Sequence, residues 1–251
     1  MNELSRKVAL VTGGGRDIGR AVSLKLAQEG AAVVVNYFDN PADASETVRK
    51  IMDAGGKAIA VQADATKADD VQKLLASTVA TFGQHIHILV NVAGGLVGRK
   101  KMDEMDEKFW DFVMDVNLKS AFLVTKSVLP HMPDGGAIVN FSSQAARDGG
   151  GSGAIAYATA KGGVLTFTRG LAKELGPRKI RVNCISPGMI NTTFHNTFTK
   201  PEVRQKVASM TPLGREGEAA EVAELVLFLV SERSAFINGE SVEINGGAFF
   251  A

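Results

Sequence analysis

The chain has 251 residues, of which 45% are hydrophobic and 22% charged, and its formal net charge is +1. This length is ample for one large α/β domain with a buried core. The near-neutral balance excludes a protein that binds nucleic acid or membrane surfaces through bulk positive charge. Because Cys184 is the one cysteine and the N-terminus shows no signal peptide, we expect a cytoplasmic protein without a membrane span.

Short apolar runs alternate along the chain with longer segments of helical periodicity. The first run predicts a strand over 8–11, and the helix after it ends at Gly30. Further strands are predicted over 32–35, 58–61, 86–90, 137–140, 180–185 and 241–244. Helices are predicted over about 41–55, 67–82, 106–131 (one helix or two), 154–176 and 218–231. After Pro187-Gly188 the pattern is irregular up to about Leu213.

The predicted strands are mostly apolar rather than alternating between apolar and polar residues, which is typical of strands buried on both faces. We therefore predict an α/β fold: a single-domain, Rossmann-type doubly wound parallel sheet of about seven strands with helices on both faces. Residues 1–251 form one predicted domain, with a substrate loop at about 188–213. Such sheets bind ligands at the carboxyl ends of their strands, so each strand end is a place to look for a site.

The turn after the first strand is rich in glycine and reads Thr12-Gly13-Gly14-Gly15-Arg16-Asp17-Ile18-Gly19. Glycines let the backbone approach a pyrophosphate, whose charge meets amide groups at the N-terminus of the next helix. The second strand ends in Asn36-Tyr37-Phe38, without the acidic residue that would bind the ribose 2′-hydroxyl of NAD. Arg16 supplies a cation for a 2′-phosphate, so the pattern favours NADP(H), with NAD(H) as the alternative.

Two later strand ends carry further candidates for cofactor contact. Asp64-Ala65 follows the third strand and could receive an adenine amino group. Asn91, Ala93 and Gly94 follow the fourth, where small residues permit close backbone approach. Taken singly, each of these signals is equally typical of an ordinary turn.

A tyrosine and a lysine mark the candidate reactive centre. Tyr157 and Lys161 are four positions apart at the start of a predicted helix, so they share one face. A lysine ammonium and an oxidised nicotinamide would lower the phenol pKa from about 10. Ser143, or its neighbour Ser142, could donate to a substrate carbonyl. Asn117 is a mediocre helix former inside a helical pattern, and could hold a water between its backbone and Lys161.

In this order and at these separations, the motifs resemble the short-chain dehydrogenase/reductase family over essentially the whole chain. The matching segments are Thr12-Gly13…Gly19, Asn91-Val92-Ala93-Gly94, Asn117, Ser143, Tyr157-x-x-x-Lys161, Pro187-Gly188…Thr192 and Ile244-Asn245-Gly246-Gly247. The resemblance implies an NAD(P)-dependent oxidoreductase that interconverts an alcohol and a carbonyl compound. It further implies a homotetramer or homodimer that associates through the helices over about 107–131 and 154–176.

The resemblance also implies roles for individual residues. Tyr157 is the acid/base, Ser143 orients the carbonyl, and Lys161 binds the nicotinamide ribose and lowers the tyrosine pKa. Asn117 maintains a water relay. The residues implied in cofactor contact near the sixth strand are Pro187, Gly188, Ile190 and Thr192.

The chain departs from the family pattern at three places. Asp17 stands where the family has glycine; aspartate tolerates left-handed backbone, but its carboxylate would repel a pyrophosphate unless it points away or pairs with Arg16. Val92 replaces a common second asparagine. The segment between Ser143 and Tyr157 is one residue longer than the commonest form, which keeps Ser142 open as the active hydroxyl.

Three predicted substrate loops, 94–101, 144–153 and 189–198, are polar. With Ser143, Gln144 and Tyr157 as substrate contacts, they favour a small polar or anionic ketone or aldehyde, such as a keto sugar or keto acid. Polar residues of the three loops are Arg99, Lys100, Lys101, Gln144, Arg147, Asp148, Asn191, His195 and Asn196.

Two other functions stay open at this point. A 3-oxoacyl-[acyl-carrier-protein] reductase would use Lys126, Arg169 and Lys173 to dock an acidic carrier. A non-enzymatic NADP-binding regulator is less favoured, because Tyr157 and Lys161 are both present. The four histidines have no metal-site spacing, and we predict no metal.

Overall fold

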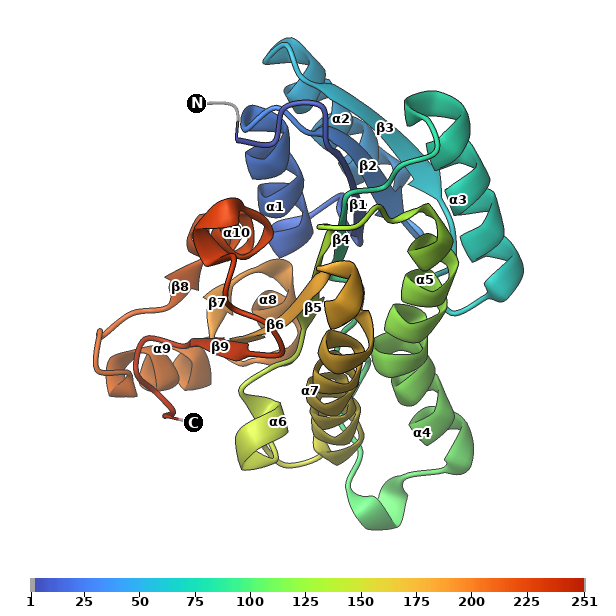
Figure 1. Cartoon of the computed structure of the whole chain (residues 1–251). Helices are drawn as coiled ribbons and strands as arrows, with labels where there is room; N and C mark the ends of the chain where they lie inside the picture. The colour runs from blue at the N-terminus through green and yellow to red at the C-terminus, as the bar shows by residue number, and fades with distance from the viewer. Residues whose placement is uncertain (1–2, 251) are drawn as a thin grey trace.

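Seven parallel strands form one sheet in the computed structural model, which describes residues 3–250 apart from the side chains of residues 194–196 (Figure 1). In spatial order the strands are β3 (Lys57–Gln62), β2 (Ala32–Tyr37), β1 (Val8–Thr12), β4 (Ile88–Asn91), β5 (Ala137–Phe141), β6 (Arg181–Pro187) and β9 (Ser241–Ile244). The order reverses direction at β1, which makes the sheet doubly wound and confirms the predicted fold class.

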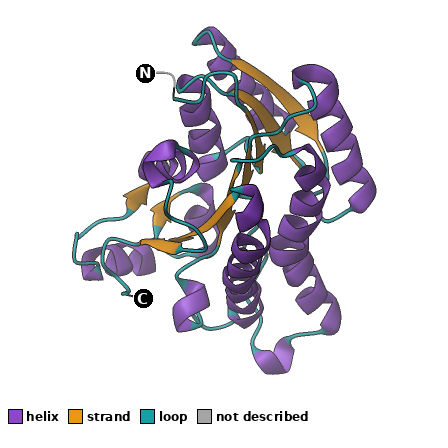
Figure 2. Ribbon diagram, in the orientation of Figure 1, coloured by secondary structure: helices purple, strands orange, loops and turns teal. Residues whose placement is uncertain are grey.

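Helices cover both faces of this sheet (Figure 2). Alternate residues of β1 separate the two faces: Ala9 and Val11 pack toward α1, α2 and α10, whereas Leu10 packs toward α3, α5 and α7. The helices are α1 (Asp17–Gln28), α2 (Pro41–Asp53), α3 (Ala68–Phe82), α4 (Glu107–Met114), α5 (Ser120–Val128), α7 (Ile155–Leu175) and α10 (Ala219–Val230). Cys184 is buried between the layers, as predicted. Among the described residues, no helix combines the length and apolarity needed to cross a membrane.

The predicted helical segment over 106–131 is interrupted between α4 and α5. Asp115–Lys119 forms a π-helical turn, and Asn117 lies at its centre. Such turns widen the helix locally and are common where a side chain serves a site. The poor helix propensity of Asn117 was therefore a usable signal of this interruption.

The segment predicted to be irregular, from Gly188 to about Leu213, contains two helices, so that prediction was wrong. The segment forms β7 (Ile190–Asn191), α8 (Thr193–Phe198) and α9 (Pro201–Met210), and β7 pairs with β8 (Gly217–Glu218). The sequence pattern missed α9 because none of its residues is buried, so no apolar stripe marks it. A proline at its first position and Glu202 in its first turn were the signals available. A short helix, α6 (Ala145–Asp148), also lies within the predicted loop after Ser143.

Candidate active site

The predicted reactive residues meet at the carboxyl ends of β4 and β5. The ammonium nitrogen of Lys161 lies 5.8 Å from the centroid of the Tyr157 ring and donates to the carbonyl oxygen of Phe141 at 2.8 Å. A Cβ placed on Gly94 would lie 2.9 Å from Lys161 Nζ and 2.8 Å from Asn117 Oδ1. Position 94, in the turn after β4, therefore has to be glycine for Lys161 and Asn117 to come this close to its backbone.

The structure distinguishes the two serines at the end of β5. Ser142 is 3% exposed, and its hydroxyl donates to the carbonyl oxygen of Lys161 at 2.8 Å. Ser143 instead forms a hydrogen bond with the Tyr157 hydroxyl. Ser143 is thus the serine that faces the tyrosine, although the segment between them is one residue longer than the common form.

Burial shifts both titratable groups of this centre. Burial raises the pKa of the Tyr157 hydroxyl above 10, and the hydrogen bond with Ser143 lowers it by a smaller amount. Burial lowers the pKa of the Lys161 ammonium to about 8. At neutral pH the protein on its own therefore holds a protonated tyrosine beside a lysine that is mostly charged. Lys161 is not among the causes of the tyrosine shift, so its predicted acidifying effect stays a prediction.

The Asn117 side chain fixes the chain after β4. Its Nδ2 donates to the carbonyl oxygens of Gly95 at 2.8 Å and Val113 at 2.9 Å, and its Oδ1 accepts from the Gly95 amide at 2.9 Å. This pairing positions Gly94 against Lys161. Since the side chain is engaged in this way, the predicted water contact would fall to the backbone of Asn117.

The glycine-rich turn, residues 12–19, forms a cradle at the N-terminus of α1. Gly13 has a φ of +62°, and a Cβ on it would lie 3.3 Å from Ala93. A Cβ on Gly19 would lie 1.9 Å from the Gly13 carbonyl oxygen, which no side chain could accommodate. No side chain caps the first turn of α1. This combination of close backbone approach and uncapped helix amides fits a pyrophosphate group.

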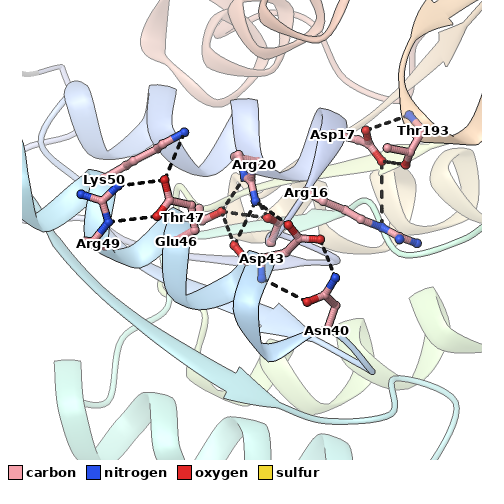
Figure 3. Close-up of polar contacts among 11 residues, drawn as sticks. Arg16, Asp17, Arg20, Asn40, Asp43, Glu46, Thr47, Arg49, Lys50 and Thr193 are labelled. Carbon is pink, nitrogen blue, oxygen red and sulfur yellow. Dashed lines mark hydrogen bonds and ion pairs between the residues drawn. The ribbon is translucent and has the colours of Figure 1, made fainter.

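Asp17 begins α1 in the left-handed region, with a φ of +49°. Its carboxylate accepts hydrogen bonds from the backbone amide of Thr193, at 3.0 Å, and from the Thr193 hydroxyl (Figure 3). Arg16 Nε lies 3.9 Å from the same carboxylate. Of the two arrangements expected for Asp17, the ion pair with Arg16 therefore occurs, and the carboxylate is bonded to Thr193 as well. Thr193 was not among the predicted site residues, because sequence spacing does not show a contact between residues 176 positions apart.

At the end of β2, the Asn36 side chain is 2% exposed and bonded to backbone groups. Its Nδ2 donates to the Ala63 carbonyl oxygen at 3.1 Å, and its Oδ1 accepts from the Gly13 amide at 3.4 Å. Asn36 thus connects β2 to the chain after β3 and to the glycine-rich turn. Tyr37 is half-buried, and the Arg16 side chain, which comes from the glycine-rich turn, is 60% exposed.

The remaining residues predicted after β3 and β4 are strongly bonded within the fold. Asp64 Oδ1 accepts from the amide and hydroxyl of Thr66 at 2.8 and 2.7 Å, and Ala65 is buried beside it. The buried Asn91 donates to Thr125 and Asn140, and its Oδ1 has no partner among the described residues. The Asp64 carboxylate and the Asn91 amide nitrogen are thus engaged within the fold.

The loop after β6 closes the opposite end of the site. The carbonyl oxygen of Pro187 accepts from the Gln144 amide at 3.0 Å, and Gly188 packs so closely that a Cβ would lie 2.6 Å from Asn245. The Ile190 side chain belongs to the hydrophobic core. Thr192 is buried and donates to the Ile190 carbonyl oxygen at 3.1 Å.

Two predicted substrate loops are bonded to each other. Arg99 donates to the Ser152 carbonyl oxygen at 3.0 Å, and the Lys100 amide donates to Gly153 at 3.1 Å. The Lys100 ammonium also pairs with Asp106 at 2.8 Å.

From the third predicted loop, the Asn191 side chain donates to both oxygens of Glu218 at 3.3 Å. The side chains of His195 and Asn196 lie outside the described residues. Within the described part of the chain no three His, Cys, Asp or Glu side chains are grouped as metal ligands. His87 Nδ1 accepts from the Val8 amide at 3.1 Å, a structural contact at the far end of β1.

Comparisons with known proteins point in one direction. A family model described as enoyl-(acyl carrier protein) reductase matches residues 13–248. The chain is 40% identical to the (3R)-3-hydroxyacyl-CoA dehydrogenase of Mus musculus, in a match that covers 98% of this chain and 97% of the relative. It is 36% identical to a 3-oxoacyl-[acyl-carrier-protein] reductase of Staphylococcus epidermidis over 245 residues, covering 97% and 99%. The solved structure of a short-chain dehydrogenase/reductase from Serratia marcescens matches with a TM-score of 0.92 and 34% identity, covering 98% and 99%.

Proposed function

The chain belongs to the short-chain dehydrogenase/reductase family and is an NAD(P)-dependent oxidoreductase, and from this premise we propose that it reduces a small carbonyl compound with NADPH as the preferred cofactor. One observation carries the proposal: the hydroxyls of Ser143 and Tyr157 are hydrogen-bonded to each other while the Lys161 ammonium lies 5.8 Å from the tyrosine ring.

Each of these residues has a defined task in the proposed reaction. When bound, the cofactor would supply the hydride, two electrons with one hydrogen nucleus, that reduces the carbonyl carbon. Tyr157 gives its proton to the carbonyl oxygen, so that an alcohol and the tyrosine phenolate result. Ser143 donates a hydrogen bond to the same oxygen as negative charge develops there. The Lys161 ammonium stabilises the phenolate, and Asn117 keeps Lys161 and the turn after β4 in register.

Backbone groups and small residues hold the cofactor in this proposal. Gly13, Ile18 and Gly19 present the first turn of α1 to the pyrophosphate. Tyr157 and Lys161 contact the nicotinamide ribose. The further contacts proposed are Asn36, Tyr37, Asp64 and Ala65 around the adenosine half, Asn91, Ala93 and Gly94 along the turn after β4, and Pro187, Gly188, Ile190 and Thr192 near the carboxamide.

The preference for NADPH depends on the end of β2. Asn36 is fixed by backbone groups and carries no charge, and the exposed Arg16 guanidinium would supply the cation for a 2′-phosphate. Fluorescence titrations should show tighter binding of NADPH than of NADH, and Arg16→Gln should reduce that ratio by about tenfold, the effect of one charge-assisted contact. Tighter binding of NADH by the wild-type protein would contradict the preference.

Turnover by serine and tyrosine variants tests the chemistry itself. Tyr157→Phe should abolish ketone reduction and leave NADPH binding nearly unchanged. Ser143→Ala should lower kcat at least about a hundredfold, as expected for loss of a donor to a developing oxyanion. The neighbouring Ser142→Ala is the matched control and should cost far less. Retained turnover in Tyr157→Phe would show that the proton comes from another group.

For the substrate we propose a small polar or anionic ketone or aldehyde, such as a keto sugar or keto acid, because the loops around the site are polar. The relatives named as a 3-oxoacyl-[acyl-carrier-protein] reductase and a 3-hydroxyacyl-CoA dehydrogenase favour a second candidate, a 3-oxoacyl thioester. A panel of keto acids, keto sugars, neutral ketones and a 3-oxoacyl thioester separates the two. Highest kcat/KM on bulky apolar ketones would contradict both candidates.

We also propose a homotetramer or homodimer formed through α4, α5 and α7. Large apolar side chains remain exposed on these helices, namely Phe112 (55%), Phe122 (44%) and Ile155 (46%). At the C-terminus, Phe250 is likewise exposed, and Ala251 lies outside the described residues. A monomer mass in sedimentation equilibrium at micromolar concentration would contradict this assembly.

A further inference from the structure

The Asp17–Thr193 contact joins two parts of the site that are far apart in sequence. Asp17 lies in the glycine-rich turn as the first residue of α1, and Thr193 is the first residue of α8 in the substrate loop. The two carboxylate oxygens are used separately: Oδ1 accepts from the Thr193 amide, and Oδ2 accepts from its hydroxyl (Figure 3). The first amide of a helix has no acceptor within the helix, so Asp17 caps α8 from a different element.

A carboxylate is an unexpected group at the start of α1. The uncapped amides of this helix face the place where a pyrophosphate is expected, and a carboxylate aimed at that place would repel it. The Thr193 amide and hydroxyl instead hold the Asp17 carboxylate at the start of α8. Asp17 also adopts a φ of +49°. This backbone conformation costs aspartate more free energy than it costs glycine, so another interaction of Asp17 has to offset that cost.

We propose that Asp17 is a positioning residue that couples cofactor binding to closure of the substrate loop, an inference that rests on the proposed function. When the Asp17–Thr193 contact opens, an unpartnered negative charge is left beside the cradle. Bound pyrophosphate therefore disfavours the open form and favours the closed one. By thermodynamic linkage, a closed substrate loop strengthens cofactor binding to the same degree.

Hydrogen exchange measures the contact without requiring turnover. Asp17→Gly removes the carboxylate and suits the backbone, because glycine adopts a φ of +49° freely. Thr193→Val removes the hydroxyl donor from the other side. Amide exchange over residues 193–198 should rise about fivefold or more in both variants, and the double variant should match the single ones. Thr197→Val, which removes only a hydroxyl bonded within α8, is the matched control and should change exchange little.

Saturating NADPH provides the second arm of the experiment. It should slow exchange over residues 193–198 in the wild-type protein and have a much smaller effect in Asp17→Gly. With an accepted ketone, both variants should raise its KM about fivefold while kcat changes less. Unchanged exchange in either variant, or equal protection by NADPH with and without the carboxylate, would overturn the coupling. Absence of turnover on every carbonyl compound, together with NADPH-dependent exchange that needs Asp17, would refute the proposed reaction and leave the coupling in place.

Discussion

Replacement of Lys161 by methionine should change how the stability of the protein depends on pH. Lys161 is 4% exposed, and burial lowers its pKa from 10.5 to about 8. Between these two values the unfolded chain binds a proton that the folded protein has released, so the free energy of unfolding rises with pH. From pH 7 to pH 9.5 this gain amounts to about 2 kcal/mol at 1.36 kcal/mol for each pKa unit.

Methionine has a similar length and no charge, so it removes the titration. It also leaves the Phe141 carbonyl oxygen without its donor, which costs about 1–3 kcal/mol at every pH and therefore cancels in the pH dependence. Urea unfolding of both proteins at pH 7, 8, 9 and 9.5, at one protein concentration, measures the difference. The exposed Lys101→Met is the control and should give a constant difference from wild type.

A wild-type-minus-Lys161→Met difference that stays flat across this range would refute the reasoning. It would mean that the ammonium keeps its ordinary pKa in the folded protein, through water or a counter-charge that reaches it. Such a flat difference would also argue against a strongly desolvated centre around Tyr157.

Three further predictions concern other parts of the fold. Gly19→Ala should abolish NADPH binding in a fluorescence titration and lower the free energy of unfolding by at least about 3 kcal/mol, because its Cβ would lie 1.9 Å from a carbonyl oxygen. The control is Gly170→Ala in α7, where nothing lies within 4 Å, and it should be neutral or stabilising by up to about 1 kcal/mol. Acidification below pH 6.5 should lower the free energy of unfolding by at most about 1.4 kcal/mol per pH unit. The reason is that burial lowers the pKa of His87, whose Nδ1 has to stay unprotonated to accept from the Val8 amide. His87→Asn should remove this pH dependence in urea titrations. Asn36→Asp should lower the thermal midpoint by more than 5 °C rather than change the cofactor preference to NADH, because a buried carboxylate would face the Ala63 carbonyl oxygen. An unchanged midpoint together with tighter NADH binding would disprove this prediction.

Much of the fold could be predicted because its signals are local. Each buried strand is a mostly apolar run, and each large helix buries one stripe of its surface, so both appear in the order of residues alone. The same holds for Tyr157 and Lys161, whose spacing places them on one face of α7. The structure confirms the parallel sheet and brings these side chains together, as the positions of strand ends required.

Sequence patterns did not predict elements that bury no residue. Helix α9 lies on the surface and has no buried residue, so its sequence differs little from that of a polar loop. The π-helical turn at Asn117 was missed for a different reason: Asn117 is buried, but one turn is too short to show a period of its own, so only an unexplained asparagine marked it. In both cases the conformation depends on contacts to other segments rather than on the periodicity of the segment itself.

The amino-acid order alone determined the layered α/β architecture, the nucleotide-type turn and the residue types of the reactive centre, since backbone propensity and burial patterns act over a few neighbouring residues. Tertiary structure alone decided which of two adjacent serines faces Tyr157, that Asn36 is enclosed by carbonyl oxygens, and that Asp17 is bonded to Thr193. Those outcomes depend on the direction in which a side chain points and on partners up to 176 positions away, and no local rule contains that information.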